Sequence, residues 1–478
     1  MRNGFPLLLA LPLLAGCTVG PDYKRPDVAG TEAAWSGPAD SAAVDLEPWR
    51  KLGDPLLVEL IETAARYNLD LRQAEARLRE ARAGRDAAAG RQFPEVVANG
   101  SVSRQQLSEH GQLPLNRLPE FDRTYSLFDF GFDASWELDL WGGTKRAVQA
   151  ATQRMLAAGA QYQDVRLRVI AETERTYAEL RGAQAQAAIL AEEAATQRRL
   201  AALMRQRWES GEVAQSDEAQ ALAQALSAEA ALPAVEANIR AAAYSLSVLT
   251  GRPPEALLER LLKPEALPRP PEQVSAGLRA DILRRRPDII AAEAQLAAAV
   301  AEVGVQTAAL FPQISLIGNV GQQARANSDF FSGESTRFQI GPVLRWPIFS
   351  GGRIRAQIRA ADAQAAAAAA AYEQAVLAAL ADSETALNRY NAAVITARKQ
   401  GSAREQMAKA LHLAKLRYTS GEDDLLQYLA EQSRYNSVAR SAADAERDLL
   451  VAHAALVKAL GGGWETPSEE IIEVVEIR

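Results

Sequence analysis

The sequence predicts an α+β membrane protein built from four amphipathic strands and a few very long helices. Four segments alternate apolar and polar residues with the two-residue period of a strand. The stretch from Gly143 to Trp208 contains no proline and is rich in helix-favouring residues. The chain also repeats itself once, so that each half supplies the same set of elements.

The chain begins with a segment typical of a bacterial lipoprotein signal peptide. A single basic residue, Arg2, precedes an apolar run from Phe5 to Leu14 that is too short to span a bilayer. The run ends at Leu14-Ala15-Gly16-Cys17, which is a lipobox. We therefore expect residues 1–16 to be removed and the Cys17 thiol to carry a covalent lipid. Thr18 after the cysteine is typical of lipoproteins sent to the outer membrane. An ordinary signal peptide with a chance cysteine is the alternative.

Composition excludes several classes of function. A net charge of −7 argues against nucleic acid as a partner. Cys17 is the only cysteine, so no disulfide, zinc thiolate or thiol-redox site can form within one chain. The three histidines, His110, His412 and His453, lie far apart and lack the spacing of metal ligands. Since no nucleophile–base pair or phosphate-binding loop is recognisable either, we predict no enzyme, no metal site and no cofactor apart from the lipid.

Two copies of one unit make up most of the chain. Residues 68–96 align without gaps with residues 286–314, and Phe93-Pro94 matches Phe311-Pro312. In each copy a helix ends at Phe-Pro, two strands follow, and a Gly-Gly pair precedes a long helix. The predicted organisation is an extended N-terminal segment (17–53), repeat 1 (54–262), a proline-rich link (263–274), repeat 2 (275–464) and a C-terminal tail (465–478).

The predicted strands cover about residues 93–106, 127–140, 312–323 and 336–348. The clearest alternation runs from Phe128 to Leu140, where aromatic and aliphatic residues share one face and Asp129, Gly131 and Asp133 lie on the other. Such a strand separates an apolar from an aqueous environment, so we expect Gly131 and Asp133 to tolerate polar substitutions. A soluble sheet packed on a core is the alternative. The lipoprotein signal and the aromatic face favour a membrane barrel, whose strands need about 10 residues.

Four strands per chain are too few to close a barrel, and an open edge in lipid would leave backbone groups unpaired. Several chains must therefore pool their strands, and three chains would supply twelve. We expect the long helices to continue the wall of the barrel as a tube of coiled coils. A helix that packs only within its own chain would show the same spacing of apolar residues and is the alternative. Apolar residues at alternating steps of three and four predict the seam, namely Val148, Ala151, Met155, Ala158 and Tyr162, and Ile354, Ile358, Ala361, Ala365 and Ala368.

Short motifs recur in a specific order along the whole mature chain. They are Cys17 with Val19-Gly20-Pro21-Asp22-Tyr23, then Asp54-Pro55-Leu56, Arg285-Arg286-Pro287-Asp288-Ile289 with Glu293, Phe311-Pro312, and Leu460-Gly461-Gly462-Gly463-Trp464. In this order and spacing they resemble the TolC-like outer-membrane factors, most closely the lipoproteins of the NodT and OprM type. The resemblance implies a homotrimer with a twelve-stranded β-barrel in the outer membrane of a Gram-negative bacterium and a long α-helical barrel in the periplasm.

The resemblance also implies a function. The trimer would be the passive exit duct of a tripartite efflux pump, anchored by outer-membrane lipid and joined to an inner-membrane RND-type transporter by a periplasmic adaptor. Lipidation and the Arg286-Pro287-Asp288 motif favour small molecules, such as drugs and toxic compounds, as the cargo. Type I protein secretion and metal efflux use the same architecture and are alternatives. A structural coiled-coil lipoprotein without a pore is an alternative from a different class.

Finally, the resemblance implies which residues form the periplasmic tip and the pore constriction. Ser210-Gly211 and Ser420-Gly421 would break the two helical hairpins at the periplasmic tip, with Arg417 and Tyr418 beside the second break, and contact the adaptor. Family members close this tip with a leucine ring and an acidic ring one helical turn later.

The leucine position of the constriction is Leu426 in this sequence, but the acidic position is Ala430. Either the neighbouring Glu431 or the Asp423-Asp424 pair supplies the charge, or the acidic ring is absent. These acids also fit a simpler role as solvated residues at a helix start, where the helix dipole favours them.

Overall fold

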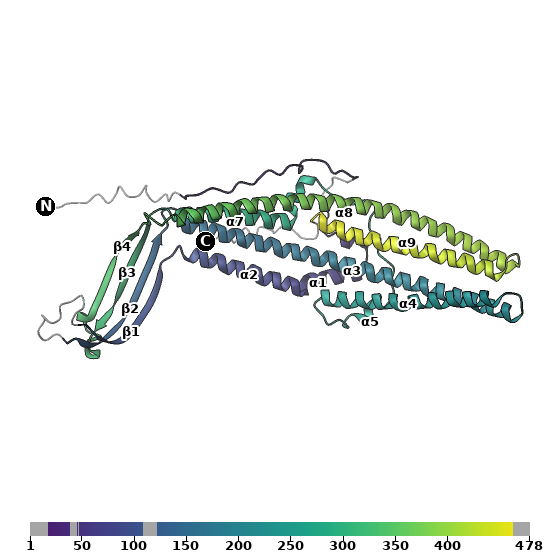
Figure 1. The fold of residues 1–478 in the computed structure, drawn as a ribbon, viewed down its shortest axis with the longest axis horizontal. Coiled ribbons are helices and arrows are strands. Elements are labelled where there is room, and N and C mark those ends of the chain that lie inside the picture. Colours follow the sequence, from purple (N-terminus) through teal and green to yellow (C-terminus); the bar gives the residue numbers. More distant parts are fainter. Residues whose placement is uncertain (1–17, 39–44, 46, 109–121, 462–478) are drawn as a thin grey trace. The chain divides into compact units, whose positions relative to one another are not determined.

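The four strands form one antiparallel sheet in the computed structural model, which describes residues 18–38, 45, 47–108 and 122–461 (Figure 1). The strand order is β1-β2-β3-β4. The bounds are β1 Glu95–Gln106, β2 Thr124–Leu138, β3 Gln313–Ala324 and β4 Thr336–Arg345. All four predicted strands are thus confirmed. The fourth ends three residues before the expected 348 because its partner β3 begins at Gln313, which pairs with Arg345.

Helices make up most of the rest of the described chain. The long ones are α2 (Leu69–Gly90), α3 (Gly143–Glu209), α4 (Gln215–Leu249), α7 (Pro287–Ala308), α8 (Arg353–Ser420) and α9 (Leu425–Ala459). The short ones are α1 (Pro55–Tyr67), α5 (Leu258–Leu261) and α6 (Ile282–Arg285). The expected proline-free long helix and its counterpart in repeat 2 are therefore both present. None of the helices in the described ranges is long and apolar enough to cross a membrane.

Two compact units divide the chain, and each draws on both repeats. One unit contains Met1–Pro26, Leu78–Ala157 and Ala292–Tyr372, and the other contains Asp27–Arg77, Ala158–Ala291 and Glu373–Arg478. The predicted signal peptide (1–16), Cys17 and the tail (465–478) lie outside the described residues.

The strand register gives the sheet one apolar and one polar face. Phe132 in β2 lies opposite Ala98 in β1 and Val320 in β3, and Val320 in turn lies opposite Phe338 in β4. The next row contains Asp133 opposite Asn319, and the Asn99 amide donates to the Asp133 carboxylate at 2.5 Å. Because side chains alternate along every strand, the whole apolar row shares one face. The two-sided strand predicted from the sequence is confirmed.

Gly131, however, has no room for a side chain, so the expectation that it tolerates polar substitutions is wrong. It pairs directly with Gly321 across β2 and β3. A Cβ at Gly131 would lie 2.5 Å from the Val320 carbonyl oxygen and 2.8 Å from the Gly321 Cα. The alternation pattern identifies the face on which a residue lies, but not how closely the neighbouring strand approaches.

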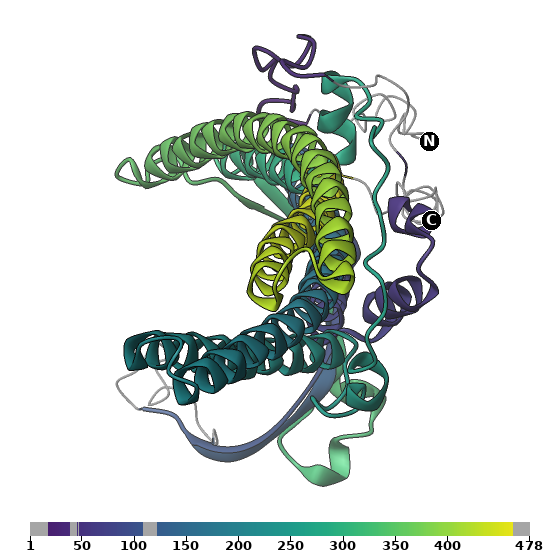
Figure 2. The same cartoon turned by 90° about the vertical axis from the view of Figure 1, so that its right-hand side faces the viewer.

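The long helices form two antiparallel hairpins, α3 with α4 and α8 with α9 (Figures 1 and 2). The breaks occur at Ser210-Gly211 and Ser420-Gly421, as expected from the sequence. Gly211 and Gly421 have φ angles of +77° and +81°, the left-handed conformation that glycine adopts without steric cost.

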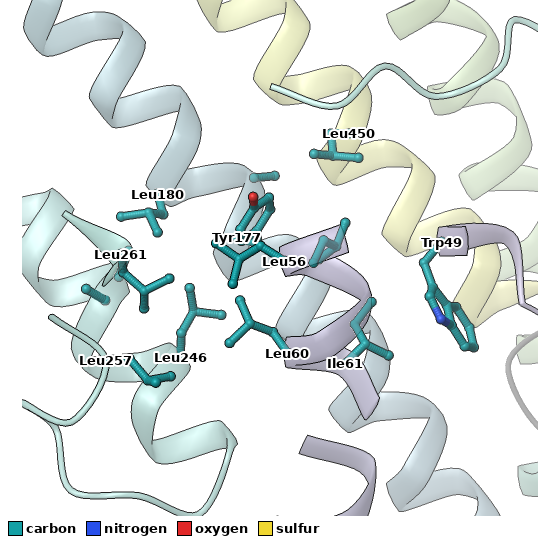
Figure 3. Packing of buried hydrophobic residues seen from close by; sticks show 14 of the residues in the cluster. Trp49, Leu56, Leu60, Ile61, Tyr177, Leu180, Leu246, Leu257, Leu261 and Leu450 are labelled. Carbon is teal, nitrogen blue, oxygen red and sulfur yellow. The ribbon is translucent and has the colours of Figure 1, made fainter. Parts of the chain in front are cut away.

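The largest apolar cluster joins α1 to the hairpins (Figure 3). Asp54 is the N-cap residue of α1, and its carboxylate accepts the N–H groups of Leu56 and Leu57 at 2.9 and 3.0 Å. The same carboxylate accepts the hydroxyl of Tyr177 in α3 at 2.5 Å. Buried members of the cluster come from α1, α3, α4, α5 and α9, namely Leu57, Leu60, Ile61, Tyr177, Leu180, Leu246, Leu261 and Leu450.

Candidate functional site

The two hairpin turns have the same backbone hydrogen bonds. In the first, the N–H of Gly211 donates to the Trp208 carbonyl at 2.9 Å and that of Glu212 to the Arg207 carbonyl at 2.8 Å. In the second, Gly421 donates to Tyr418 at 3.2 Å and Glu422 to Arg417 at 2.9 Å. Each turn is therefore a Schellman motif that satisfies the last carbonyls of its helix.

Charged side chains bind one another around these turns. The Arg417 guanidinium contacts the Asp423 carboxylate at 2.7 Å. Asp424 caps α9 by accepting the N–H of Gln427 at 2.9 Å, and its other oxygen lies 3.6 Å from the guanidinium of Arg207 in α3. The sequence pointed to the two acids but not to the contact with Arg207, because Arg207 and Asp424 lie in different repeats, far apart in the chain. Tyr418 stacks on Tyr428 with 5.6 Å between ring centroids.

Leu426 is partly buried and packs on the first hairpin. It joins a cluster with Leu200, Leu203 and Met204 of α3 and the small residues Ala221 and Ala225 of α4. One turn later, Ala430 is exposed, and the neighbouring Glu431 forms an ion pair with Arg434. The structure thus brings Leu426, Asp423 and Asp424 together near the second turn, with each acid already bound to an arginine.

A row of polar contacts joins α3 to α9 away from the turns. The Glu193 carboxylate accepts hydrogen bonds from Gln197 at 2.7 Å, Ser433 at 2.8 Å and Asn436 at 2.8 Å. Burial opposes ionisation of this carboxyl, but the three hydrogen bonds outweigh it and hold the pKa of Glu193 below its usual range. No local pattern indicated this cluster, since its residues in α3 and α9 lie about 240 positions apart.

Replacing Glu193 by Gln is expected to lower the free energy of unfolding by about 1 kcal/mol at pH 7, because a partly buried carboxylate loses charge-assisted hydrogen bonds. Since the folded pKa of Glu193 is depressed, this stabilisation is present above the unfolded pKa of about 4.3 and is lost as the pH falls through the lower folded value. Thermal melting at pH 7 and pH 3 measures it, with Glu405→Gln, which changes an exposed acid, as the control. A difference from wild type that is equally large at both pH values contradicts the assignment.

A buried polar pair lies further along the same two helices. Nδ1 of His453 in α9 is 2.6 Å from a carboxylate oxygen of Glu174 in α3, and both side chains are almost fully buried. The remaining oxygen of Glu174 and Nε2 of His453 have no hydrogen-bond partner among the described residues. Within the same ranges no group of three or more His, Cys, Asp or Glu residues is arranged to hold a metal. The pair therefore connects two helices, and nothing around it forms a metal centre.

Comparison with known proteins agrees with this architecture. The family model described as "Outer membrane efflux protein" matches residues 60–252 and 278–462, one segment in each repeat. OpmQ of Pseudomonas putida, a pyoverdine export outer membrane protein, is 32% identical over 465 residues that cover 97% of both chains. OprJ, an outer membrane protein of Pseudomonas aeruginosa, is 33% identical over 477 residues, covering 96% of this chain and 95% of OprJ.

A solved structure of the outer-membrane channel OprN has the same fold. It superposes with a TM-score of 0.82 at 35% identity and covers 94% of this chain and all of that one. The resemblance to TolC-like outer-membrane factors that the motifs indicated is thus confirmed. The chain therefore belongs to the outer membrane efflux protein family, and it is a transport duct of the outer membrane rather than an enzyme.

Proposed function

We propose that three copies of this chain form the outer-membrane exit duct of a tripartite pump that exports small molecules. The observation that supports this most is the four-stranded sheet. It has one apolar and one polar face, and β1 and β4 each pair on one side only among the described strands. In lipid the free edges need partners, and β1 of one copy beside β4 of the next provides them. Three copies then close a twelve-stranded barrel whose polar face lines the pore.

Exposed apolar side chains on two helices support assembly with further copies. Leu226 and Val248 of α4 are 55% and 53% exposed, and Leu413 and Leu416 of α8 are 57% and 51% exposed. A single chain leaves these rows in water, although helix surfaces of this kind normally pack on another helix. We propose that α4 and α8 of adjacent copies cover one another, so that the long helices form a helical barrel.

The N-terminal segment is held where a lipid anchor at Cys17 would reach the membrane boundary. The Val19 N–H donates to the carbonyl of Trp141, just after β2, at 3.1 Å. The buried Arg146 at the start of α3 donates to the Val19 carbonyl at 3.2 Å and contacts Asp22 at 2.7 Å. Thr18 is therefore fixed at the junction of strand and helix, and we propose that acyl chains on Cys17 enter the adjacent leaflet.

Intact mass of protein purified from native membranes is expected to show loss of residues 1–16 and addition of acyl chains to Cys17. A protein that retains Met1, or that carries a free thiol at Cys17, contradicts the lipoprotein assignment. Cys17→Ser is expected to leave part of the protein assembled, since each buried methylene of a lipid contributes only about 0.8 kcal/mol.

We further propose that the two hairpin turns, with Ser210, Gly211, Arg417, Tyr418, Ser420 and Gly421, contact the periplasmic adaptor. The adaptor in turn joins the duct to an inner-membrane RND-type transporter, which supplies the energy. Leu426 closes the pore near these turns. The charge at the constriction comes from Asp423, Asp424 or Glu431, because Ala430 has none.

Leu426→Ser is expected to raise the resting conductance of the channel in planar bilayers, because apolar rings close pores by excluding water. The same recordings test the duct itself. If neither the wild-type protein nor Leu426→Ser conducts, the result would favour a structural coiled-coil lipoprotein without a pore. Replacing Asp423 and Asp424 by Asn serves as the companion variant and is expected to weaken cation selectivity. Conductance of Leu426→Ser equal to that of wild type would place the constriction elsewhere.

A further inference from the structure

Each repeat contains a junction at which a helix of 22 residues begins beside the end of one of 35 residues. In repeat 1 the Asn68 side chain donates to the carbonyl of Leu249 at the end of α4, at 3.0 Å. In repeat 2 the aligned residue, Arg286, donates to the carbonyl of Ala459 at the end of α9, also at 3.0 Å. The repeat alignment therefore identifies two residues with the same task, to hold the C-terminus of a long helix.

The glycines that follow the long helices complete the correspondence. Gly251 and Gly461 have φ angles of +73° and +70°. A Cβ on Gly251 would lie 2.4 Å from the carbonyl oxygen of Tyr67, and one on Gly461 would lie 3.1 Å from that of Arg285. Each glycine thus contacts the residue just before Asn68 or Arg286. The two junctions share their backbone geometry and differ mainly in the side chain that crosses them.

Arg286 makes contacts that Asn68 does not. Its guanidinium binds both oxygens of Asp288 at 3.0 and 2.7 Å, and it reaches the Ala379 carbonyl at 3.4 Å and the Asp382 carboxylate at 3.5 Å, both in α8. The Asn68 side chain bonds only to α4 and to the start of α2 within the described chain. Arg286 thus connects the start of α7 to both arms of the α8–α9 hairpin, whereas Asn68 holds one arm of its own hairpin.

A cavity lies beside this junction. It has a volume of about 740 Å³ and separates the hairpin from α3, with Asp164 and Leu167 of α3 on one side and Asp382, Arg389 and Lys458 on the other. Side chains in a packed interface fix the distance between helices, and none fills the space here. Other contacts also hold the hairpin at this level, since the Ser383 hydroxyl donates to the Ala459 carbonyl at 2.8 Å and His453 joins α9 to Glu174 of α3. Arg286 is the side chain that links both arms of the hairpin to the start of α7.

We propose that Arg286 is a positioning residue that fixes the α8–α9 hairpin to the start of α7 and thereby limits the tilt of the hairpin at that end. The planar guanidinium suits this role because it binds several acceptors at once in a fixed geometry. Helix α9 has 35 residues and its far end carries the second hairpin turn, so a tilt of ~5° at Ala459 displaces that turn by roughly 5 Å. All contacts of Arg286 described above lie within one chain, so they hold the hairpin whatever the number of copies.

The test gives repeat 2 the residue of repeat 1, Arg286→Asn, in the full-length membrane-inserted protein. Spin labels at Glu209→Cys and Glu422→Cys, which are exposed at the two turns, report the distance between the hairpins, with labelled chains diluted in unlabelled ones. We expect a broader and shifted distance distribution, together with on the order of a tenfold rise in resting open probability in planar bilayers. Arg284→Asn is the matched control, since Arg284 is exposed and makes no ion pair with the described residues.

Melting temperatures are measured in parallel, because Arg286 also contributes to stability. A variant that melts earlier but keeps the wild-type distance and conductance would show that Arg286 only stabilises the fold, and would overturn the proposal. An equal change in Arg284→Asn would do the same. If Arg286→Asn does not assemble, Arg286→Lys decides the question, since lysine keeps the charge but lacks the planar fork. Unchanged distances in that variant reject the proposal, and a shifted distribution supports it.

Discussion

Phe132→Arg is expected to abolish stable assembly in the membrane. Phe132 lies in the apolar row of the sheet between Ala98 and Val320, and its ring is 49% exposed and contacts Phe130. A charged side chain on the lipid face near the bilayer midplane costs about 2–4 kcal/mol, and a trimer contains the substitution three times. The yield of folded protein in outer membranes and the thermal stability of the purified assembly both measure the loss.

The opposite face of the same strand provides the control. Asp133 is the next residue, lies on the polar face and accepts a hydrogen bond from Asn99. Asp133→Asn is expected to change stability little, because it keeps a polar side chain in water. Phe132→Leu, which stays apolar, separates the effect of charge from that of size. Equal tolerance of Phe132→Arg and Asp133→Asn would mean that the apolar face does not contact lipid, and a monomeric native mass would reject the pooled barrel.

His453→Leu is expected to destabilise the helical part of the molecule by about 1–3 kcal/mol, because removing one partner of a buried hydrogen bond leaves the other polar group unsatisfied. The remaining partner, Glu174, is fully buried and would have no hydrogen bond from a side chain among the described residues. Glu174→Leu is expected to have a similar effect. Chemical denaturation followed by circular dichroism measures both variants.

The double variant distinguishes the loss of a hydrogen bond from a packing effect. Replacing both partners of a buried hydrogen bond by apolar groups of similar shape is often nearly neutral, since no polar group is then left unsatisfied. We therefore expect His453→Leu combined with Glu174→Leu to recover most of the lost stability. A double variant that is as unstable as the sum of the single ones would show that the shape of these side chains matters more than their hydrogen bond.

Local patterns in the sequence were sufficient to predict the secondary structure. The strands, the two hairpin breaks at Ser210-Gly211 and Ser420-Gly421 and the helix ends before Phe93-Pro94 and Phe311-Pro312 are all where the sequence indicated. Apolar residues recur with a period of two in strands and of about three and a half in packed helices. These patterns, and the effects of glycine and proline on the backbone, depend only on residues that are close in the chain. Such signals are fully contained in a short window, so a single sequence is enough to interpret them.

The internal repeat also predicted which positions of the two hairpins are equivalent. Aligned residues such as Asn68 and Arg286 occupy equivalent junctions, as do Gly251 and Gly461. The alignment did not reveal what the side chains bind, because the partners of Arg286 in α8 lie more than 90 residues away. The alignment of the two repeats shows which positions are equivalent, whereas the partners of each side chain depend on which turns of two helices lie side by side.

Only the tertiary structure decided which side chains are partners. The sequence predicted a polar face at Gly131, but the close approach of Gly321 on the neighbouring strand excludes a side chain there. It identified Asp423 and Asp424 as acids near a constriction, and the fold pairs them with Arg417 and Arg207. Periodicity fixes the direction of a side chain relative to its own helix or strand. The register between elements far apart in the chain depends on the packing of the whole fold, and that register determines whether a residue is free, paired or buried.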